Sequence, residues 1–102
     1  MAKIIWTIPA LERLNAIADY IARDKADAAN RLVQRIFART DSLEWLPEMG
    51  RRVPEMRGSK YREMVVPPCR IIYRIEGEVV KIVTVIRGEQ HSKPEDVIKA
   101  DL

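Results

Sequence analysis

Basic side chains recur along residues 69–89, a stretch otherwise rich in β-branched residues. A strand buried on both faces consists of nearly continuous Val, Ile and Leu, so these cations require a face of their own. Arginine predominates over lysine, and guanidinium groups suit paired hydrogen bonds to carboxylates or phosphates. Anion binding is therefore one interpretation, and a charged surface that discourages edge pairing is the other. The four cations are Arg70, Arg74, Lys81 and Arg87.

The positive charge of the chain is concentrated in one segment. The net charge is +3 over 102 residues, yet residues 1–50 hold seven basic and seven acidic side chains. Residues 51–74 hold seven basic side chains against two acidic ones, a net charge of +5. Such a patch predicts a polyanionic or acidic partner, either a nucleic acid or an acidic protein segment. The seven basic residues are Arg51, Arg52, Arg57, Lys60, Arg62, Arg70 and Arg74.

Residues able to transfer a proton are few and scattered. Metal-independent RNA cleavage needs a base for the 2′-hydroxyl, cations for the phosphorane charge and an acid for the leaving oxygen. The candidates for acid or base are Tyr61, Glu63, Glu89 and His91. Their spacing matches no recognised catalytic arrangement, and we interpret His91 as a solvated linker side chain. We interpret the two glutamates as ion-pair partners of Arg62 and Arg87, respectively.

Length and composition indicate a small protein with one hydrophobic core. A chain of 102 residues with 47% apolar side chains can form one core but not two, so residues 1–102 are expected to form a single domain. The lone cysteine, Cys69, excludes an internal disulfide and is expected in the core, and no Cys or His cluster has metal-ligand spacing.

Trp6 and Trp45 are interpreted as packing residues, with the alternative that one lies in a partner groove. Without a secretory or membrane-spanning stretch, a cytoplasmic protein that needs no metal or cofactor is expected.

Two helices are predicted in the N-terminal half. A short apolar strand at residues 3–6 leads to Thr7, a suitable N-cap for a helix that extends to about Arg23. Asp24 is a candidate cap for a second helix, which must stop before Pro47 because a residue that precedes proline disfavours the α region. Since the link between them is so short, the two helices are expected to pack as an antiparallel hairpin.

Three strands are predicted after residue 60, where the apolar period changes from 3.6 to 2. Residues 61–66 form the first, and a two-residue turn at Glu76-Gly77 separates the other two. With Ile75 opposite Glu78, one face of the ribbon is almost wholly apolar and should lie under the helices. That face should hold Cys69, Ile71, Tyr73, Ile75, Val80, Ile82 and Thr84. The other face should hold Arg70, Ile72, Arg74, Val79, Lys81, Val83, Val85 and Arg87.

A short terminal helix is predicted from about Lys93. The sequence Ser92-Lys93-Pro94-Glu95 has the spacing of a capping box, in which the first and last side chains satisfy each other's backbone N–H groups. The expected apolar contacts of this helix are Val97, Ile98 and Leu102.

Several motifs follow one another in a recognisable order. They are the helical hairpin ADYIARDKADAANRLVQRI, a Gly-Arg turn at residues 50–51 within LPEMGRRVPEMRG, an Arg-Glu-x-x-Val strand at 62–66, a Tyr-Arg-Ile-x-Tyr-like strand at 69–73 and a hydrophobic last strand at 79–86. In this order and spacing they resemble the RelE/ParE superfamily of small bacterial toxins from type II toxin–antitoxin pairs. The resemblance covers nearly the whole chain.

The resemblance implies a fold and a partner. The fold is α+β with the order β-α-α-β-β-β: an N-terminal helical hairpin packed on a twisted, mainly antiparallel sheet, followed by the short C-terminal helix. The partner is a cognate antitoxin whose extended, acidic C-terminal region lays apolar side chains along the hairpin and carboxylates against the arginines. The implied antitoxin- or target-binding residues are Arg51, Arg62, Arg70, Arg74, Lys81 and Arg87.

The superfamily divides by mechanism. RelE-like members cut messenger RNA in the ribosome, and in such a chain the catalytic residues would be Arg70, Arg87, Lys60 and Arg62. RelE-like chains also carry a C-terminal tyrosine, whereas the tyrosines here are Tyr20, Tyr61 and Tyr73.

ParE-like members inhibit DNA gyrase and have no demonstrated hydrolytic site. The REMVV and PEMGR motifs look ParE-like, although Arg87-Gly88 stands where ParE-like chains often have His-Gly. A ParE-like gyrase inhibitor is therefore expected, more a binding protein than an enzyme. The alternatives are a RelE-like ribosome-dependent endoribonuclease and a divergent member that retains antitoxin binding alone.

Overall fold

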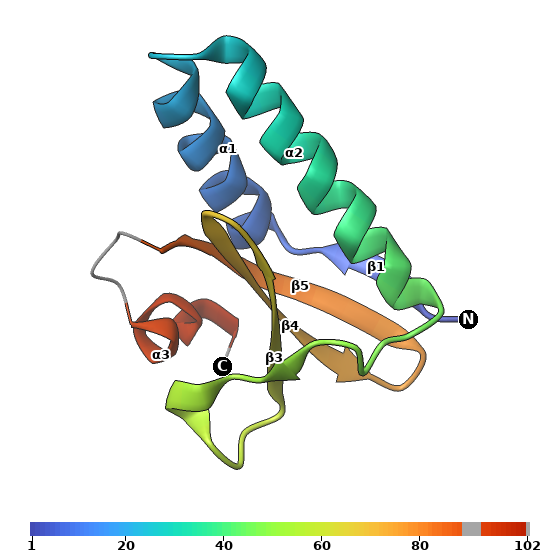
Figure 1. Ribbon diagram of the computed structural model, residues 1–102. Helices are drawn as coiled ribbons and strands as arrows, with labels where there is room; N and C mark the ends of the chain where they lie inside the picture. The colour runs from blue at the N-terminus through green and yellow to red at the C-terminus, as the bar shows by residue number, and fades with distance from the viewer. Residues whose placement is uncertain (89–92, 102) are drawn as a thin grey trace.

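A helical hairpin followed by a five-stranded sheet forms most of the structure (Figure 1). The computed structural model describes residues 1–88 and 93–101, so roles assigned above to Glu89, His91, Ser92 and Leu102 lie outside the described residues. The α+β class and the predicted order of elements are confirmed, with one further short strand, β2. The elements are β1 (Lys3–Trp6), α1 (Ile8–Ala22), α2 (Ala26–Asp41), η1 (Ser42–Glu44), β2 (Arg51–Arg52), η2 (Pro54–Met56), β3 (Tyr61–Val66), β4 (Cys69–Glu76), β5 (Val79–Arg87), α3 (Pro94–Val97) and η3 (Lys99–Asp101).

The two long helices begin differently. Thr7 caps α1 as predicted, because its Oγ1 accepts a hydrogen bond from the N–H of Ala10 at 3.3 Å and donates one to the carbonyl of Ile82 at 2.8 Å. The predicted cap of α2 by Asp24 is wrong. The N–H groups of Asp24 and Lys25 both bond to the carbonyl of Ile21, so Asp24 still belongs to the turn that ends α1, and Lys25 takes the cap position without a side-chain bond.

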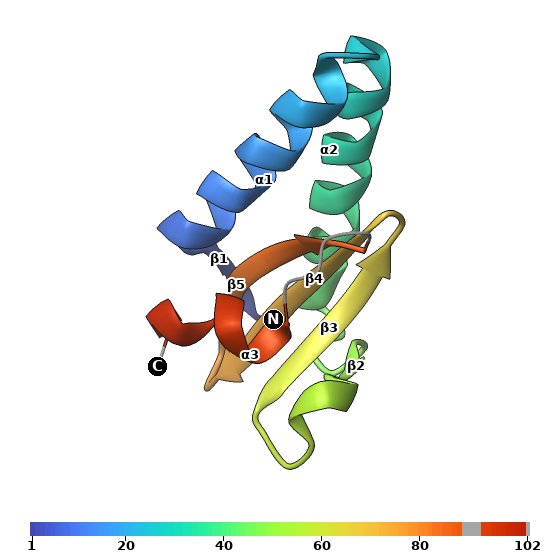
Figure 2. The ribbon, with the colours of Figure 1, turned by 90° about the vertical axis from the view of Figure 1, so that its left-hand side faces the viewer.

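The helical hairpin projects beyond the sheet. Figures 1 and 2 show α1 and α2 running antiparallel, with the ends joined by their link lying away from the strands. Only the lower turns of the hairpin therefore cover the sheet, and its tip is open to solvent. Within the described ranges no helix combines the length and the apolar character needed to cross a bilayer.

The sheet has the strand order β1-β5-β4-β3-β2. Strand β1 is parallel to β5, and every other pair is antiparallel, so the predicted, mainly antiparallel sheet is confirmed. The predicted turn between β4 and β5 is one residue too early. Glu76 pairs with Val79, and the loop is Gly77-Glu78, because the first loop residue has a φ of +59° that glycine adopts without strain.

A β-bulge in β5 changes the faces that its last residues occupy. Tyr73 lies opposite Ile82, but Ile72 lies opposite Thr84, so Val83 is an extra residue in the ladder. Side chains on β4 follow the predicted alternation, with Tyr73 buried toward the hairpin. After the bulge the alternation on β5 is reversed. The predicted placement of Val85 and Arg87 on the face away from the helices is therefore wrong, and both lie on the hairpin side. The predicted placement of Thr84 under the helices is wrong as well, because Thr84 lies opposite Ile72.

Each face of the sheet carries its own apolar cluster. The hairpin side includes Cys69, as predicted, and the buried residues of α1 and α2. The opposite face, hereafter the outer face, is covered at one end by α3 and η2 (Figure 1), and its apolar cluster includes the fully buried Ile72 and Ile98. The outer face is therefore not a purely charged surface. Its cluster consists of Val53, Tyr61, Ile72, Val83, Ile86 and Ile98, with Met56 and Val97 packed against it.

The Gly50-Arg51 turn is fixed by a close contact with Tyr73. The Tyr73 hydroxyl accepts a hydrogen bond from the N–H of Gly50 and donates one to the carbonyl of Pro47, both at 2.8 Å. A Cβ on Gly50 would lie 2.6 Å from the Tyr73 hydroxyl and 2.6 Å from the carbonyl oxygen of Glu63. Only glycine allows the backbone to approach the sheet this closely, and the approach brings Arg51 beside β3.

Replacing Gly50 with alanine is expected to lower the free energy of unfolding by about 1–3 kcal/mol, because the new methyl group overlaps main-chain and side-chain oxygens. Urea denaturation measures the change. In the double variant Gly50→Ala, Tyr73→Phe the loss should be smaller than the sum of the two single losses, because the phenylalanine removes one of the overlapping atoms. An unchanged urea midpoint for Gly50→Ala would contradict the contact.

Candidate functional site

The outer face gathers four of the six predicted binding residues. Arg51 comes from β2, Arg70 and Arg74 from β4, and Lys81 from β5, where it lies directly opposite Arg74. Like charges placed opposite each other on neighbouring strands repel. The arrangement therefore depends on carboxylates that lie between the cations.

A buried carboxylate joins Arg51 to Arg70. The Glu63 side chain is fully buried, and its two oxygens accept hydrogen bonds from Arg51 Nε at 2.7 Å and from Arg70 Nε at 2.8 Å. Arg70 also donates through both terminal nitrogens to Glu55 on η2, each at 2.8 Å. The guanidinium of Arg70 is thus held between two carboxylates, one buried and one exposed.

Arg62 does not take part in this cluster. The prediction that Glu63 pairs with Arg62 is wrong, because successive side chains of β3 point to opposite faces. Arg62 instead donates from Nη1 to the main-chain carbonyls of Gly50 at 2.8 Å and Glu48 at 3.3 Å. In the described contacts these bonds attach the connection between α2 and β2 to β3.

A second cluster attaches the C-terminal segment to the outer face. Asp101 on η3 accepts hydrogen bonds from Arg74 Nε at 2.8 Å and from the Tyr61 hydroxyl at 2.7 Å. Arg74 also pairs with Glu76, whose carboxylate lies 3.5 Å from Lys81 Nζ. Asp101 was missed in the sequence, since it lies 27 residues from Arg74 and belongs to no recognisable motif.

Ion pairing fixes the charge states of both clusters. Hydrogen bonds from Arg70 lower the pKa of Glu55, and the carboxylates of Glu55 and Asp101 raise the pKa values of Arg70 and Arg74, respectively. Burial and the hydrogen bond to Asp101 raise the pKa of Tyr61 to about 12. At neutral pH Tyr61 is therefore a hydrogen-bond donor and not a base. The arrangement suits recognition of charged groups better than proton transfer.

Arg87 lies apart from the outer face. Its guanidinium carbon is 4.2 Å from the centre of the Tyr20 ring on α1, in a cation–π contact. Beside it, Arg13 Nε donates to the carbonyl of Val85 at 3.3 Å. A groove of about 280 Å³ lies here between α1 and the end of β5. The bulge thus moves one predicted site residue to the helical hairpin.

The four residues implied for RNA cleavage are not brought together. Arg70 is in the outer-face cluster, Arg87 is against α1, and Arg62 binds carbonyls on the hairpin side. Lys60 lies over the ring of Tyr61, with Nζ 5.7 Å from the ring centre. Glu63, a candidate base, is enclosed by two arginines.

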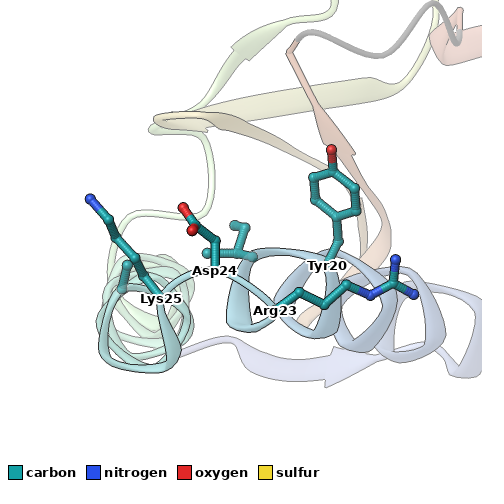
Figure 3. Close-up of a pocket in the computed structure, with 6 residues that line it drawn as sticks. Tyr20, Arg23, Asp24 and Lys25 are labelled. Carbon is teal, nitrogen blue, oxygen red and sulfur yellow. The ribbon is translucent and has the colours of Figure 1, made fainter.

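A pocket of about 460 Å³ lies at the tip of the helical hairpin. Figure 3 shows Tyr20 on α1, with Arg23, Asp24 and Lys25 following in the link to α2. Tyr20, which contacts Arg87, is 56% exposed and so remains accessible to a partner. The tip therefore combines an aromatic surface with charges of both signs.

Comparison with known proteins identifies the family. The family model described as "ParE toxin of type II toxin-antitoxin system, parDE" matches residues 4–91. The chain belongs to the ParE toxin family. It is 40% identical over 86 residues to Toxin RelE2 of Caulobacter vibrioides, a match that covers 83% of this chain and 93% of the relative. It is 41% identical over 90 residues to the protein Y4kP of Sinorhizobium fredii, covering 86% and 90% of the two chains.

The fold of this ParE-family toxin is also similar to a solved structure. A chain from the chromosomal ParDE toxin–antitoxin system of P. aeruginosa has a TM-score of 0.72 and 25% sequence identity, and the match covers 87% of this chain and 98% of that chain. The resemblance to the RelE/ParE superfamily is therefore confirmed. The protein is the toxin of a type II toxin–antitoxin system.

The motifs that carry the ParE resemblance are those that build the outer face. The Gly50-Arg51 turn places Arg51 beside Glu63, which is the glutamate of the REMVV strand. The arginine of the following strand, Arg70, completes the cluster. Glu55, which sequence reasoning missed, is the glutamate of the second PEM segment. Its signal in the sequence was that it is one of only two acidic residues in the basic segment 51–74.

Replacing Glu63 with glutamine is expected to lower the free energy of unfolding by about 2–4 kcal/mol, because Arg51 and Arg70 lose a buried counter-charge. Urea denaturation of the purified toxin measures the loss. Glu76→Gln is the matched control, since that side chain is 60% exposed and solvent screens its ion pair, so the variant should keep nearly the urea midpoint of the wild type. Equal losses in the two variants would contradict the central position of Glu63.

The stability contributed by Asp101 is expected to depend on pH. Burial alone would raise the pKa of Asp101, but the bonds from Arg74 and Tyr61 outweigh it, and the pKa falls below its ordinary value of 3.8. A group with a lowered folded-state pKa contributes stability above its unfolded value and loses it as the pH falls through the folded value.

The difference in unfolding free energy between the wild type and Asp101→Asn should therefore be constant from about pH 8 to pH 5. It should shrink only when the pH falls below 3.8, the ordinary pKa of the carboxyl group. Urea titrations at a series of pH values measure it. A difference that already shrinks near neutral pH would show that the carboxylate is not held in these bonds.

Proposed function

We propose that this toxin is ParE-like: it inhibits DNA gyrase by binding and is held inactive by a cognate antitoxin. The observation that carries the proposal is the match of the ParE family model to residues 4–91. The geometry of the outer face supports it independently, because the charged groups there are arranged for ion pairing.

A binding role is supported by the state of each charged group. To stabilise a phosphorane, Arg70 would have to leave both Glu55 and Glu63, and nearby Tyr61 is protonated at neutral pH because its pKa is raised to about 12. The one observation that favours ribosome-dependent RNA cleavage instead is the name of a relative, Toxin RelE2, at 40% identity. That activity is the second candidate.

For the antitoxin, the proposal assigns two kinds of contact. Apolar side chains would dock along α1, where Ile8 is 71%, Leu11 38% and Tyr20 56% exposed. Carboxylates would approach the outer face, where the Arg51 side chain is 64% exposed. An acidic segment could also replace Glu55, itself 43% exposed, as a partner of Arg70. Apolar docking supplies affinity, and charge complementarity supplies specificity and rate of association.

Two assays on the purified toxin distinguish the candidate activities. In a supercoiling reaction the toxin should block DNA gyrase or trap broken DNA, and in a translation reaction it should leave ribosome-bound messenger RNA uncut. Messenger RNA cut in codon register, together with unchanged supercoiling by gyrase, would overturn the proposal and indicate a RelE-like endoribonuclease. Antitoxin binding without either effect would identify a divergent member that has lost its target.

The double variant Arg70→Ala, Arg74→Ala is expected to bind the antitoxin about tenfold or more weakly, a loss of at least about 1.4 kcal/mol. Isothermal titration calorimetry measures the affinity, and circular dichroism checks that the variant remains folded. The control Lys3→Ala, Lys99→Ala removes the same charge from exposed lysines outside the two clusters and should bind normally. Unchanged affinity in the arginine variant, or equal losses in both variants, would count against the assignment.

A further inference from the structure

An open apolar groove lies at the end of the molecule far from the hairpin tip. One wall is the connection between α2 and β2, with Trp45, Leu46 and Met49, and the other is the turn between β4 and β5, with Ile75 and Gly77. In Figure 1 these two segments lie close to the N-terminus. The groove has a volume of about 610 Å³, within the range of about 300–1,000 Å³ found for binding pockets. It is called the Trp45 groove below.

The apolar side chains of the Trp45 groove face solvent. Trp45 is 72% exposed, Leu46 62% and Met49 44%, so the prediction that Trp45 is a packing residue is wrong. Trp6, by contrast, packs against Phe37 with ring centres 4.9 Å apart, as predicted. A contiguous exposed patch of large apolar side chains marks an interaction site, and tryptophan is the residue type most enriched among energetically dominant contacts.

The groove is held in shape by main-chain hydrogen bonds. The N–H of Trp45 donates to the carbonyl of Ser42 at 3.2 Å, and the N–H of Met49 donates to the carbonyl of Leu46 at 3.0 Å. The Tyr73 hydroxyl binds Pro47 in the same connection. Because the backbone is fixed, a partner would meet a preformed surface and would not have to order a loop.

The two chain segments that line the groove are acidic, whereas residues 51–74 are basic. Residues 44–49 and 75–78 carry four glutamates and no lysine or arginine, whereas residues 51–74 have a net charge of +5. Glu76 is paired with Arg74, but Glu48 and Glu78 are exposed. Arg62 reaches this connection only to donate to main-chain carbonyls. The groove should therefore attract a basic segment and repel an acidic antitoxin tail.

We propose that the Trp45 groove binds a basic protein segment with an apolar anchor, presented by the target of the toxin. The inference rests on the proposed function in one respect, that the toxin acts by binding a protein target. Proteins that hold nucleic acids, as both candidate targets do, present lysine- and arginine-rich surfaces because these neutralise phosphates. The acidic antitoxin segment binds the hairpin and the outer face. The toxin thus has one recognition surface for an acidic partner and another for a basic partner.

The direct test uses two synthetic peptides without tryptophan. In one, leucines alternate with lysines, and in the other, glutamates replace the lysines. The lysine peptide should bind the purified toxin saturably in calorimetry and shift the fluorescence of Trp45, the more exposed of the two tryptophans. Its affinity should fall about tenfold or more in Trp45→Ala and in Leu46→Ala, and stay unchanged in Lys99→Ala, which changes a side chain that is 73% exposed and does not line the groove.

Two outcomes of the peptide test would overturn the proposal. One is tighter binding of the glutamate peptide in the groove, which would assign this surface to an acidic partner. The other is lysine-peptide binding that the Trp45→Ala change leaves intact. Since both mutated side chains are largely exposed, the variants should keep the urea midpoint of the wild type, which separates lost binding from lost folding.

A cellular test separates this inference from the proposed function. Trp45→Ala with Leu46→Ala should abolish growth arrest and retain antitoxin affinity, and Arg70→Ala with Arg74→Ala should weaken antitoxin binding. Loss of antitoxin affinity in the Trp45 variant would overturn the proposal, as would a wild-type dimer that this variant converts to a monomer. If the wild type fails to inhibit gyrase, the proposed function fails, while growth arrest and peptide binding still test the groove.

Discussion

The structure depends on one buried carboxylate. Glu63 is enclosed on the outer face and neutralised by Arg51 and Arg70, which reach it from the strands on either side of β3. Burying an ion is costly, and the cost is offset only where counter-charges and hydrogen bonds satisfy it. Strand β2 has only two residues, and the ion pair of Arg51 with Glu63 adds a side-chain contact to its short ladder with β3. The Gly50 turn, the REMVV strand and the arginine of β4 thus act as one structural unit.

Strand alternation accounts for what could be predicted from the sequence. The faces of β4 were correct because its charged residues all fall on one parity and Ile72 is the one apolar residue among them, with Ile71 and Tyr73 buried toward the hairpin. The end of β5 was wrong because Val83 and Val85 are equally apolar. Since valine suits either apolar face, side-chain type alone does not reveal the bulge between them. The bulge moves Arg87, a predicted site residue, from the outer face to α1.

The ion-pair partners were harder to predict for a different reason. Glu63 was assigned to Arg62, although alternation already places neighbouring residues of a strand on opposite faces, so that error was avoidable. Glu55 and Asp101 were not assigned, because their proximity to Arg70 and Arg74 arises only when η2 and the C-terminal segment fold over the sheet. The exposure of Trp45 likewise depends on a connection whose path no local pattern specifies.

These features provide surfaces for ion pairing and for apolar contacts. The outer-face arginines are engaged with internal carboxylates, the groove at Trp45 is apolar with acidic surroundings, and the helical hairpin offers an aromatic surface beside Arg87. Because Arg70 neutralises the buried Glu63, the two side chains should be energetically coupled across β3 and β4. A double-mutant cycle with Glu63→Gln and Arg70→Ala, measured by urea denaturation, tests it most directly. If the two side chains are coupled, the cycle should give a coupling energy of at least about 1 kcal/mol, and losses that add to within about 0.3–0.5 kcal/mol would show that they are independent.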